Sequence, residues 1–465
     1  MSTIPGISNA NTGTISSAGI GSGLDVKSIV AQLMTSEQGP LKRLQSQEGA
    51  TTAKISAYGQ IQSSLGSFQT ALTTLGSGGL TSQLASSSDV GTLGVTASSD
   101  ATSGTYSVNV SQLASFDKLV SAGVPTSPVS MADGSMTIQV GAGKSFNFSG
   151  SYSVKDLAQA INTAGAGVTA SVINDGTANH LSLTSTVSGA ANQISVTASG
   201  GLAQFDTNAM VTVTNPDGSL QTKKAMTDIP GQDAKLMIDG VSITKSTNSI
   251  TDAISGVTLN LSKVSASSTS NTTISVTRDD TKIKANISSF VSAYNSLLST
   301  VKNLTSYNLG TKTAAVLNSD AAANSVLSQI GRVVSQDVSG GAFNTLPSIG
   351  ITRKTDGSLS IDDTKLSVAL STNAAGVNNL FNGANGIAIS MTKVAATLIS
   401  PTGILASNQT NFASTVKSLQ NREAAEATRL TSVQAAYQKQ FSALDTLLSS
   451  MTSQNAFLTQ ALAKL

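Results

Sequence analysis

The segment PLKRLQSQEGATTAKISAYGQIQSSLGSFQTALTTL, residues 40–75, sets the architecture of the chain. Its apolar residues recur mostly at steps of three and four, which predicts an α-helix with a coiled-coil-like seam. Pro40 is well placed to open this helix, and the GSGG run at 76–79 stops it. An uninterrupted helix here would be about 50 Å long. Its apolar row is named the stalk seam: Leu41, Leu44, Ile55, Tyr58, Leu65, Phe68 and Leu72.

The C-terminal end carries a matching helical pattern. Apolar residues spaced by seven form one row, with a second row beside it: Leu430, Tyr437, Leu444, Met451, Leu458 and Leu465, then Phe441, Leu448, Asn455 and Leu462. Asn455 either sets the register of a coiled coil or faces solvent. Arg422, Glu423, Glu426 and Arg429 can form i,i+3 pairs, each contributing roughly 0.2–0.5 kcal/mol. Because exposed apolar seams are unfavourable in water, the helices over 41–75 and 410–465 should bury each other or a partner.

The N-terminus has two parts. Residues 1–20 show neither charge nor apolar period, which predicts a flexible leader. A short helix with Asp25 in its first turn is then predicted from an apolar stripe: Leu24, Val26, Ile29, Val30, Leu33 and Met34.

The middle of the chain changes to a period of two, which predicts β-strands. Asp239-Gly240 between alternating segments predicts a two-residue hairpin, and Asp356-Gly357 predicts a second turn. Ser153 and Asp156 form a capping-box-like pair before a short helix that ends near Ile161. Helical period returns from 281 and again over 365–380.

These patterns predict an α+β multidomain protein, in which terminal coiled-coil-like helices form a stalk and β-rich head domains are inserted. The expected division is: 1–40, leader and short helix; 41–79, N-terminal stalk helix; 80–129 plus 231–275, β-rich head domain; 130–230, nested α+β insertion; 276–408, helical and β stalk domain; 409–465, C-terminal coiled-coil-like helix.

Composition limits the function classes. The 465 residues carry a net charge of +2 and no basic stripe, which argues against a nucleic-acid partner. The absence of cysteine rules out disulfides and thiolate metal sites. No secretory signal is expected at the N-terminus. No membrane span is expected either, because the most apolar stretch, 387–399, is interrupted by polar residues and a membrane helix needs about 20 apolar ones.

No residue pattern supports catalysis. His180 is the single histidine and lies in a predicted polar turn, and the carboxylates are scattered. The glycines of 19–23 lack the preceding strand of a dinucleotide loop, and Gly143-Lys144-Ser145 lacks the first glycine of a phosphate loop. The chain is therefore expected to be no enzyme and to hold no cofactor or metal.

Several stretches resemble the flagellar filament-capping family, also called the hook-associated protein 2 family. They are SGLDVKSIVAQLM at 22–34 with PLKRL at 40–44, GTYSVNVSQLA at 104–114, GQDA at 231–234 with IDGV at 238–241, GIT at 350–352 with DGSL at 356–359, and QFSALDTL at 440–447 through LTQ at 458–460. Residues 150–200, marked by DLAQAIN at 156–162, resemble an insertion shared by flagellar axial proteins.

The resemblance implies a secreted protein of bacterial motility. Such proteins leave the cell through the type III export channel, form a ring of identical copies at the distal tip of the filament, and promote the folding and insertion of flagellin. The implied partners are further copies, flagellin and the filament tip, hook–filament junction proteins and an export chaperone.

The resemblance also assigns roles to residues. Filament contact falls on Leu24, Ile29, Leu33 and Met34. The chaperone contact, which could instead be an intramolecular seam, falls on Leu444, Leu448, Met451, Phe457, Leu458 and Leu462.

Two alternatives to the cap stay open at this point. The chain could be another axial component, either flagellin or a hook–filament junction protein, since terminal seams alone do not separate these. It could also be a tip adhesin that binds host glycans through its loops, a role compatible with capping.

Overall fold

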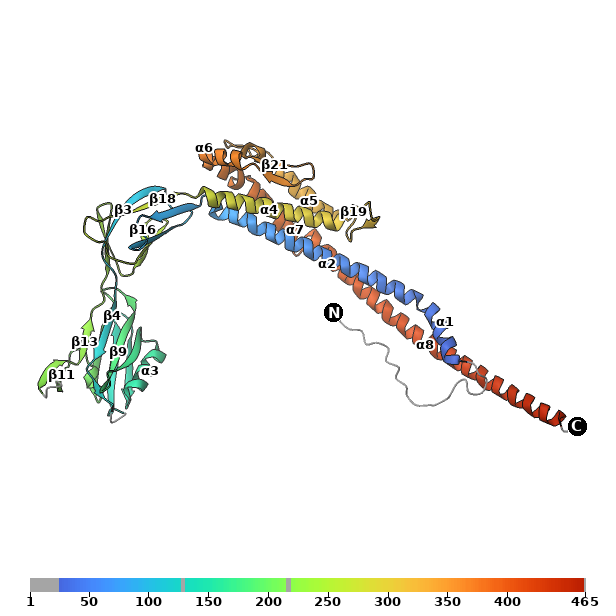
Figure 1. The fold of residues 1–465 in the computed structure, drawn as a ribbon, viewed down its shortest axis with the longest axis horizontal. Helices are drawn as coiled ribbons and strands as arrows, with labels where there is room; N and C mark the ends of the chain where they lie inside the picture. The colour runs from blue at the N-terminus through green and yellow to red at the C-terminus, as the bar shows by residue number, and fades with distance from the viewer. Residues whose placement is uncertain (1–24, 127–129, 215–218, 464–465) are drawn as a thin grey trace. The chain divides into compact units, whose positions relative to one another are not determined.

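The computed structural model describes residues 25–126, 130–214 and 219–463, which form two compact units. The first combines the segment up to Gly76 with the segment from Ile287 onward, and the second is the continuous stretch Ser77–Asn286 (Figure 1). The leader predicted over 1–20, and Leu24, lie outside the described residues. The finer division of the chain into six segments stays a prediction.

The first unit is mainly helical. Its elements are α1 (Val26–Glu37), α2 (Gly39–Thr74), the later turns of α4 (Asp280–Thr305), α5 (Ala321–Val334), α6 (Asp363–Asn382), α7 (Ile387–Ile399), α8 (Ile404–Leu462), the 3₁₀ turn η3 (Leu346–Ile349), and the hairpins β19 (Tyr307–Asn308)–β20 (Thr313–Ala314) and β21 (Ile351–Arg353)–β22 (Leu359–Ile361).

The N-terminal helices begin where the sequence predicts. Pro40 lies in the first turn of α2, where its missing N–H costs nothing. The expectation for Asp25 was wrong in one detail, because this residue is the cap of α1 rather than part of its first turn. Its carboxylate accepts the backbone N–H of Ser28 at 3.0 Å, since the first N–H groups of a helix lack internal partners.

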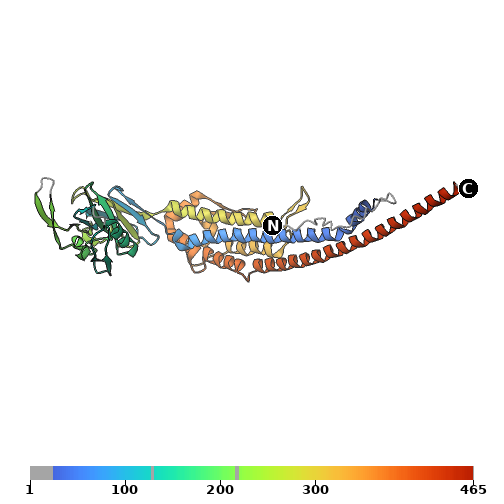
Figure 2. The ribbon, with the colours of Figure 1, turned by 90° about the horizontal axis from the view of Figure 1, so that it is seen from below.

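The long C-terminal helix α8 is continuous over 59 residues and starts at Ile404. Its first half runs beside α2, and its last turns continue beyond α1 (Figure 2). The prediction that the two terminal helices pack against each other is confirmed for this first half.

One stretch within Asp363–Leu462 is apolar enough, by length and composition, to cross a membrane, with a mean hydropathy of 1.3 in its best window. The expectation that no such stretch exists was therefore wrong by that criterion. The structure divides the stretch into α6, α7 and α8, and the 13 residues of α7 are fewer than the ~20 needed for a span. The face of α7 that includes Ile387, Met391 and Leu398 is buried in the protein core.

The second unit is β-rich. Its elements are the π turn η1 (Leu75–Gly79, which begins in the first unit), β1 (Gln83–Ser87), β2 (Leu93–Ala97), β3 (Gly104–Gln112), β4 (Phe116–Ser121), β5 (Val124–Pro125), β6 (Gly134–Val140), β7 (Ser145–Gly150), α3 (Val154–Ala164), β8 (Val168–Asn174), β9 (Ala178–Ser188), β10 (Ile194–Gly200), the 3₁₀ turn η2 (Ala203–Phe205), β11 (Met210–Thr214), β12 (Leu220–Lys224), β13 (Met226–Ile229), β14 (Ala234–Ile238), β15 (Val241–Lys245), β16 (Ser249–Ile254), β17 (Val257–Leu261) and β18 (Thr272–Arg278).

Two separate hydrophobic cores lie within this unit. A five-stranded sheet of order β1-β18-β3-β14-β15 and the sheet β16-β17-β2 surround the first core, which contains Leu93, Val108 and Leu259. The sheets β13-β4-β9-β5 and β10-β6-β7, with α3, surround the second core, which contains Ile138 and Leu181.

The predicted hairpin at Asp239-Gly240 is confirmed. Both residues adopt positive φ angles, 48° and 87°, as a two-residue turn of this type requires. The turn joins β14 to β15 in the predicted register, with Ile238 opposite Val241.

The second core also takes in residues from β4. Leu119, on β4, packs in the same core as Ile138 and Leu181. The reason is non-local, because β4 pairs with β9, more than 60 residues later in the chain.

Candidate assembly surface

The stalk seam of α2 is buried over its C-terminal half. Tyr58, Leu65, Phe68 and Leu72 are at most 1% exposed, because α2 packs here against α7 and α8. The ring of Phe68 lies 5.9 Å from that of Phe290, within the range of favourable aromatic contacts. Ile55 is partly buried beside this core.

The hydroxyl of Tyr58 adds two hydrogen bonds to this apolar region. Its hydroxyl donates to the carboxylate of Asp320 at 2.7 Å and accepts from the amide of Asn408 at 2.9 Å. Burial, followed by the bond to Asp320, raises the pKa of Tyr58 above its usual value, so the hydroxyl keeps its proton. Asp320 also caps α5 by accepting the N–H of Ala323.

The residues predicted for filament contact divide between surface and core. Leu33 is 38% exposed and Ile29 is half-buried. Met34 instead packs with Val26, Val30 and Leu430, so α1 covers one section of α8. Leu24 lies outside the described residues. The four residues are therefore not equivalent, and their filament role stays a prediction.

The first turns of the stalk seam join this same region. Leu44 is buried, whereas Leu41 is half-buried and packs against the cluster of Met34 and Leu430. Arg429 of α8 lies 3.0 Å from Glu37 of α1 and also binds Glu426 at 3.0 Å. The i,i+3 pairing predicted for Glu426 and Arg429 is thus confirmed, and Arg429 extends it from α8 to α1.

Beyond Phe441, α8 exposes an apolar face that no other part of the described chain covers. Leu448 is half-buried, and the other members are exposed, from 43% for Leu444 to 70% for Leu462. The face consists of Leu444, Leu447, Leu448, Met451, Leu458 and Leu462 and is named the distal α8 face. Phe457, also predicted for the chaperone contact, is 72% exposed but lies roughly 120° around the helix from Met451. Leu447 was missing from the predicted set, although its spacing from Leu444 and Met451 could have revealed it. Asn455 is exposed within this face, four residues after Met451, and so faces solvent in the described chain.

A carboxyl pair lies between α2 and α8. Glu423 is 8% exposed, and one of its oxygens, Oε1, has no hydrogen-bond partner in the described chain. Burial, followed by the nearby carboxyl of Glu48, raises the pKa of Glu423. Glu48 accepts a hydrogen bond from the amide of Gln420 at 2.7 Å. Glu423 therefore keeps its proton to a higher pH than an ordinary glutamate.

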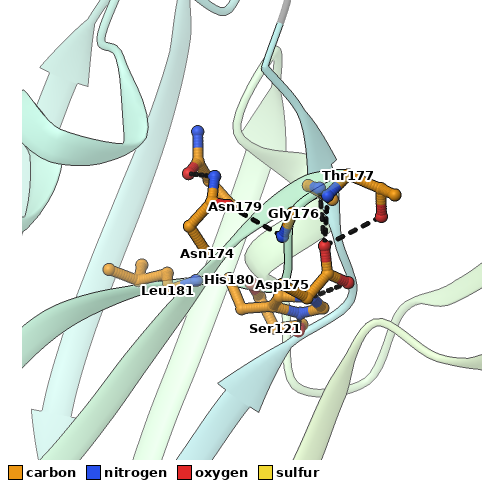
Figure 3. Close-up of polar contacts among 9 residues, drawn as sticks. Ser121, Asn174, Asp175, Gly176, Thr177, Asn179, His180 and Leu181 are labelled. Atoms are coloured by element: carbon orange, nitrogen blue, oxygen red, sulfur yellow. Dashed lines mark hydrogen bonds and ion pairs between the residues drawn. The ribbon is translucent and has the colours of Figure 1, made fainter.

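His180 has a structural position in the second unit (Figure 3). Its Nδ1 lies 2.8 Å from the carbonyl oxygen of Ser121, and its Nε2 lies 3.1 Å from Asp175. The carbonyl of Ser121, followed by Asp175, raises the pKa of the imidazole. The turn expected at this position was wrong, because His180 lies in β9 and joins that strand to β4.

Asp117 is a buried carboxylate that sequence reasoning missed. It is 1% exposed, and its two oxygens accept the backbone N–H groups of Ile194 at 2.5 Å and Gly231 at 3.1 Å. Burial, followed by Asp117, raises the pKa of neighbouring Asp228. Since each of these hydrogen bonds joins segments far apart in sequence, Asp117 fastens the nested part where the chain enters and leaves it.

The described ranges, 25–126, 130–214 and 219–463, contain no group of three His, Asp or Glu residues placed to hold a metal ion. The geometry instead provides a buried helical core and, on α8, a long exposed apolar face. An exposed apolar face of this kind can bind another helix.

Three parts of the sequence match models of known families. Residues 22–117 match the N-terminus of flagellar hook-associated protein 2, and residues 231–453 match its C-terminus. Residues 135–187, within the nested part, match the flagellin hook IN motif.

Curated relatives match over nearly the whole chain. The sequence is 32% identical over 466 residues to flagellar hook-associated protein 2 of Escherichia coli strain K12, covering 96% of this chain and 98% of that protein. It is 31% identical over 478 residues to the A-type flagellar hook-associated protein 2 of Pseudomonas aeruginosa, covering 98% of each. Among solved structures, the D1-D2-D3 domains of the flagellar cap protein FliD from Escherichia coli match with a TM-score of 0.64 and 32% identity, over 77% of this chain and 99% of that one.

Proposed function

The chain belongs to the flagellar hook-associated protein 2 family of flagellar cap proteins, and from this membership we propose that it promotes the folding and insertion of flagellin at the filament tip. The family acts at the distal tip of the flagellar filament and is structural. This chain would act on flagellin through apolar contact surfaces, because the described residues provide apolar helix faces and buried cores.

The observation that supports this proposal is the distal α8 face. An apolar face of this length is stable in water only when a partner covers it, and amphipathic helices are the usual partners of such faces. Before export the partner is a chaperone, and in the assembled filament it is a helix of another axial subunit. The protein acts as a ring of identical copies, which also meets the hook–filament junction proteins at the start of assembly.

Deleting the gene and restoring it on a plasmid tests the proposal. The deletion strain should lack filaments and release flagellin monomers into the medium, and the restored strain should regain filaments. Antibody against the chain should label only filament tips in electron micrographs. Labelling along the whole shaft would indicate a flagellin instead, and normal filaments in the deletion strain would refute the capping role.

Host-glycan binding stays a prediction. It would be supported by glycan binding that an isolated fragment of residues 80–275 retains.

A further inference from the structure

The pairing of β4 and β5 with β9 is interrupted beside His180. β4 ends at Ser121 and β5 begins at Val124, and the two strands pair with β9 on either side of this point. Side chains supply hydrogen bonds at the interruption. The hydroxyl of Ser121 accepts the N–H of Leu181 at 2.8 Å, and Nδ1 of His180 lies 2.8 Å from the carbonyl oxygen of Ser121. Gly123 gives the imidazole space, because a Cβ there would lie 3.4 Å from its Cε1 atom.

The other side of the imidazole faces an exposed turn between β8 and β9 (Figure 3). Nε2 of His180 lies 3.1 Å from Oδ2 of Asp175. The second oxygen of the same carboxylate, Oδ1, accepts the backbone N–H groups of Thr177 at 2.8 Å and Ala178 at 2.7 Å and so holds the turn. The imidazole therefore joins the turn to the end of β4.

The two partners of the imidazole fix its protonation. A carbonyl oxygen and an ionised carboxylate only accept hydrogen bonds, so each ring nitrogen of His180 must donate. A neutral imidazole has one N–H group, and only the imidazolium has two. The observed arrangement is therefore complete only when His180 is charged. The raised pKa of His180, caused by the carbonyl of Ser121 and then by Asp175, agrees with this count of donors.

Two charged side chains act on the imidazole from the surrounding elements. Asp175 favours the imidazolium, whereas Lys223 of β12 opposes it. β5 and β8 contribute no titratable side chain. In the described chain no hydrogen bond or ion pair joins the imidazole to the other titratable residues of β4, β12 and β13, which are Asp117, Lys118, Lys224 and Asp228.

We propose that His180 is a pH-sensitive link between the exposed turn at Asp175 and the end of β4. As an imidazolium it binds both. After losing one proton it keeps the bond from Nδ1, because Ser121 is only 3% exposed, whereas the Asp175 side chain is 47% exposed and water can replace its bond. The lone pair of Nε2 then faces the carboxylate of Asp175 and repels it, so the turn is released.

The direction of the pH effect follows from the raised pKa. The stability that this link adds is fully present below the unfolded value of about 6.5 and is lost as pH rises through the folded value. The nested part therefore presents a fixed turn at acid pH and a released turn at alkaline pH. This inference goes beyond the proposed function and holds whether or not the chain caps filaments.

The single histidine makes the link measurable in the full-length chain, expressed without a histidine tag. Nuclear magnetic resonance of ring-nitrogen-labelled histidine should show both nitrogens protonated at acid pH. On titration Nε2 should lose its proton and Nδ1 should keep its own, with a pKa above the ordinary value of about 6.5. Titration at or below the ordinary value, or a neutral form protonated at Nε2, would overturn the proposal.

Two variants should move the pKa of His180 in opposite directions. Asp175→Asn keeps an oxygen for the turn and places an amide donor opposite Nε2, so it favours the neutral imidazole and should lower the pKa. Lys223→Gln removes the opposing charge and should raise it. Asp89→Asn is the matched control, because Asp89 also holds a turn, accepting the N–H of Gly91 at 3.0 Å, and it should leave the pKa unchanged. A pKa that ignores Asp175→Asn would refute the link.

Hydrogen exchange reports the release of the turn. Once corrected for its intrinsic pH dependence, exchange at the amides of Thr177 and Ala178 should be about fivefold faster above the folded pKa of His180 than below it, the effect of losing one partly exposed hydrogen bond. Asp175→Asn should remove this difference, since its amide can donate to the neutral imidazole. Equal protection of the natural chain at both pH values would show that the turn is held without His180, and the proposal would fail.

Discussion

The hydroxyl of Tyr58 lies 2.7 Å from the carboxylate of Asp320, across a sequence separation of 262 residues. This bond joins the longest N-terminal helix to the cap of α5. Replacing Tyr58 with Phe should lower the free energy of unfolding by about 1.5–3 kcal/mol. The variant loses a hydrogen bond to a charged group, and the carboxylate of Asp320 is left with one donor fewer. Urea unfolding followed by far-ultraviolet circular dichroism measures this loss.

The matched control is Tyr294→Phe. The hydroxyl of Tyr294 donates to the neutral carbonyl of Gly357 at 3.1 Å, so its loss should cost only about 1 kcal/mol. Equal costs for both variants would show that the charge of Asp320 adds nothing.

The carboxyl pair of Glu48 and Glu423 predicts a pH dependence. The folded-state pKa of Glu423 is raised, so its contribution to stability is fully present below the unfolded value of about 4.3 and is lost as pH rises through the folded value. The variant Glu423→Gln should therefore raise the melting temperature at pH values above that range and make it less dependent on pH. Thermal unfolding at several pH values is the measurement.

Glu426→Gln serves as the opposite control on the same helix. Glu426 is paired with Arg429, so replacing it with neutral glutamine should lower the melting temperature slightly rather than raise it. A Glu423→Gln variant that melts lower than the natural chain at neutral pH would contradict the raised pKa of Glu423.

Asp117 should be essential to the nested part. Asp117→Ala leaves the N–H groups of Ile194 and Gly231 buried without their acceptor and should cost about 2–4 kcal/mol. Hydrogen exchange should accelerate at these two amides more than in the sheet containing Leu259. Asp133→Asn, at an exposed carboxylate, is the control and should change neither the free energy of unfolding nor the exchange at these two amides. Unaltered exchange in Asp117→Ala would mean that water replaces the carboxylate.

The distal α8 face should matter for partners and not for the stability of the free chain. Leu444→Asp/Leu448→Asp adds two charges to that face and should abolish chaperone binding, a loss of at least about 100-fold in affinity. The melting temperature should hardly change, because Leu444 is exposed and Leu448 only half-buried. Isothermal titration with the purified chaperone measures the affinity.

Thr446→Asp/Ser453→Asp adds the same charges to the side of α8 that helical spacing places away from Leu444. Chaperone affinity should be retained in this control. An unchanged affinity in Leu444→Asp/Leu448→Asp would remove the face from the chaperone contact.

Local patterns predicted a large part of this fold. The period of α2, its proline start and the Asp239-Gly240 turn all depend on residues that are close in sequence. They can therefore be predicted without tertiary information. The cap of α3 is another example, where the hydroxyl of Ser153 accepts the N–H of Asp156 at 3.1 Å as predicted.

What the sequence did not reveal depends on distant partners. The helices α5 and α7 were not predicted, although α5 has an apolar row that includes Val326 and Ile330. α7 has apolar residues on several of its sides, and so broad an apolar distribution weakens the period that marks a helix. The burial of Met34 and the exposure of Leu444, both apolar and on helices, follow from which turns of α1 reach α8, and no local pattern contains that information.

The pairing of α2 with α8 also governs the order of folding. Glu48 and Gln420, which touch in the structure, are separated by 372 residues, whereas every strand of the second unit finds its partner within Ser77–Asn286. Contacts between distant residues close slowly, because the intervening chain must be confined first. A chain delivered linearly from either end can therefore complete its β-rich unit while its terminal helices still lack each other. We therefore expect the helical unit to fold last. Until then the stalk seam of α2 stays exposed and can be bound by another protein.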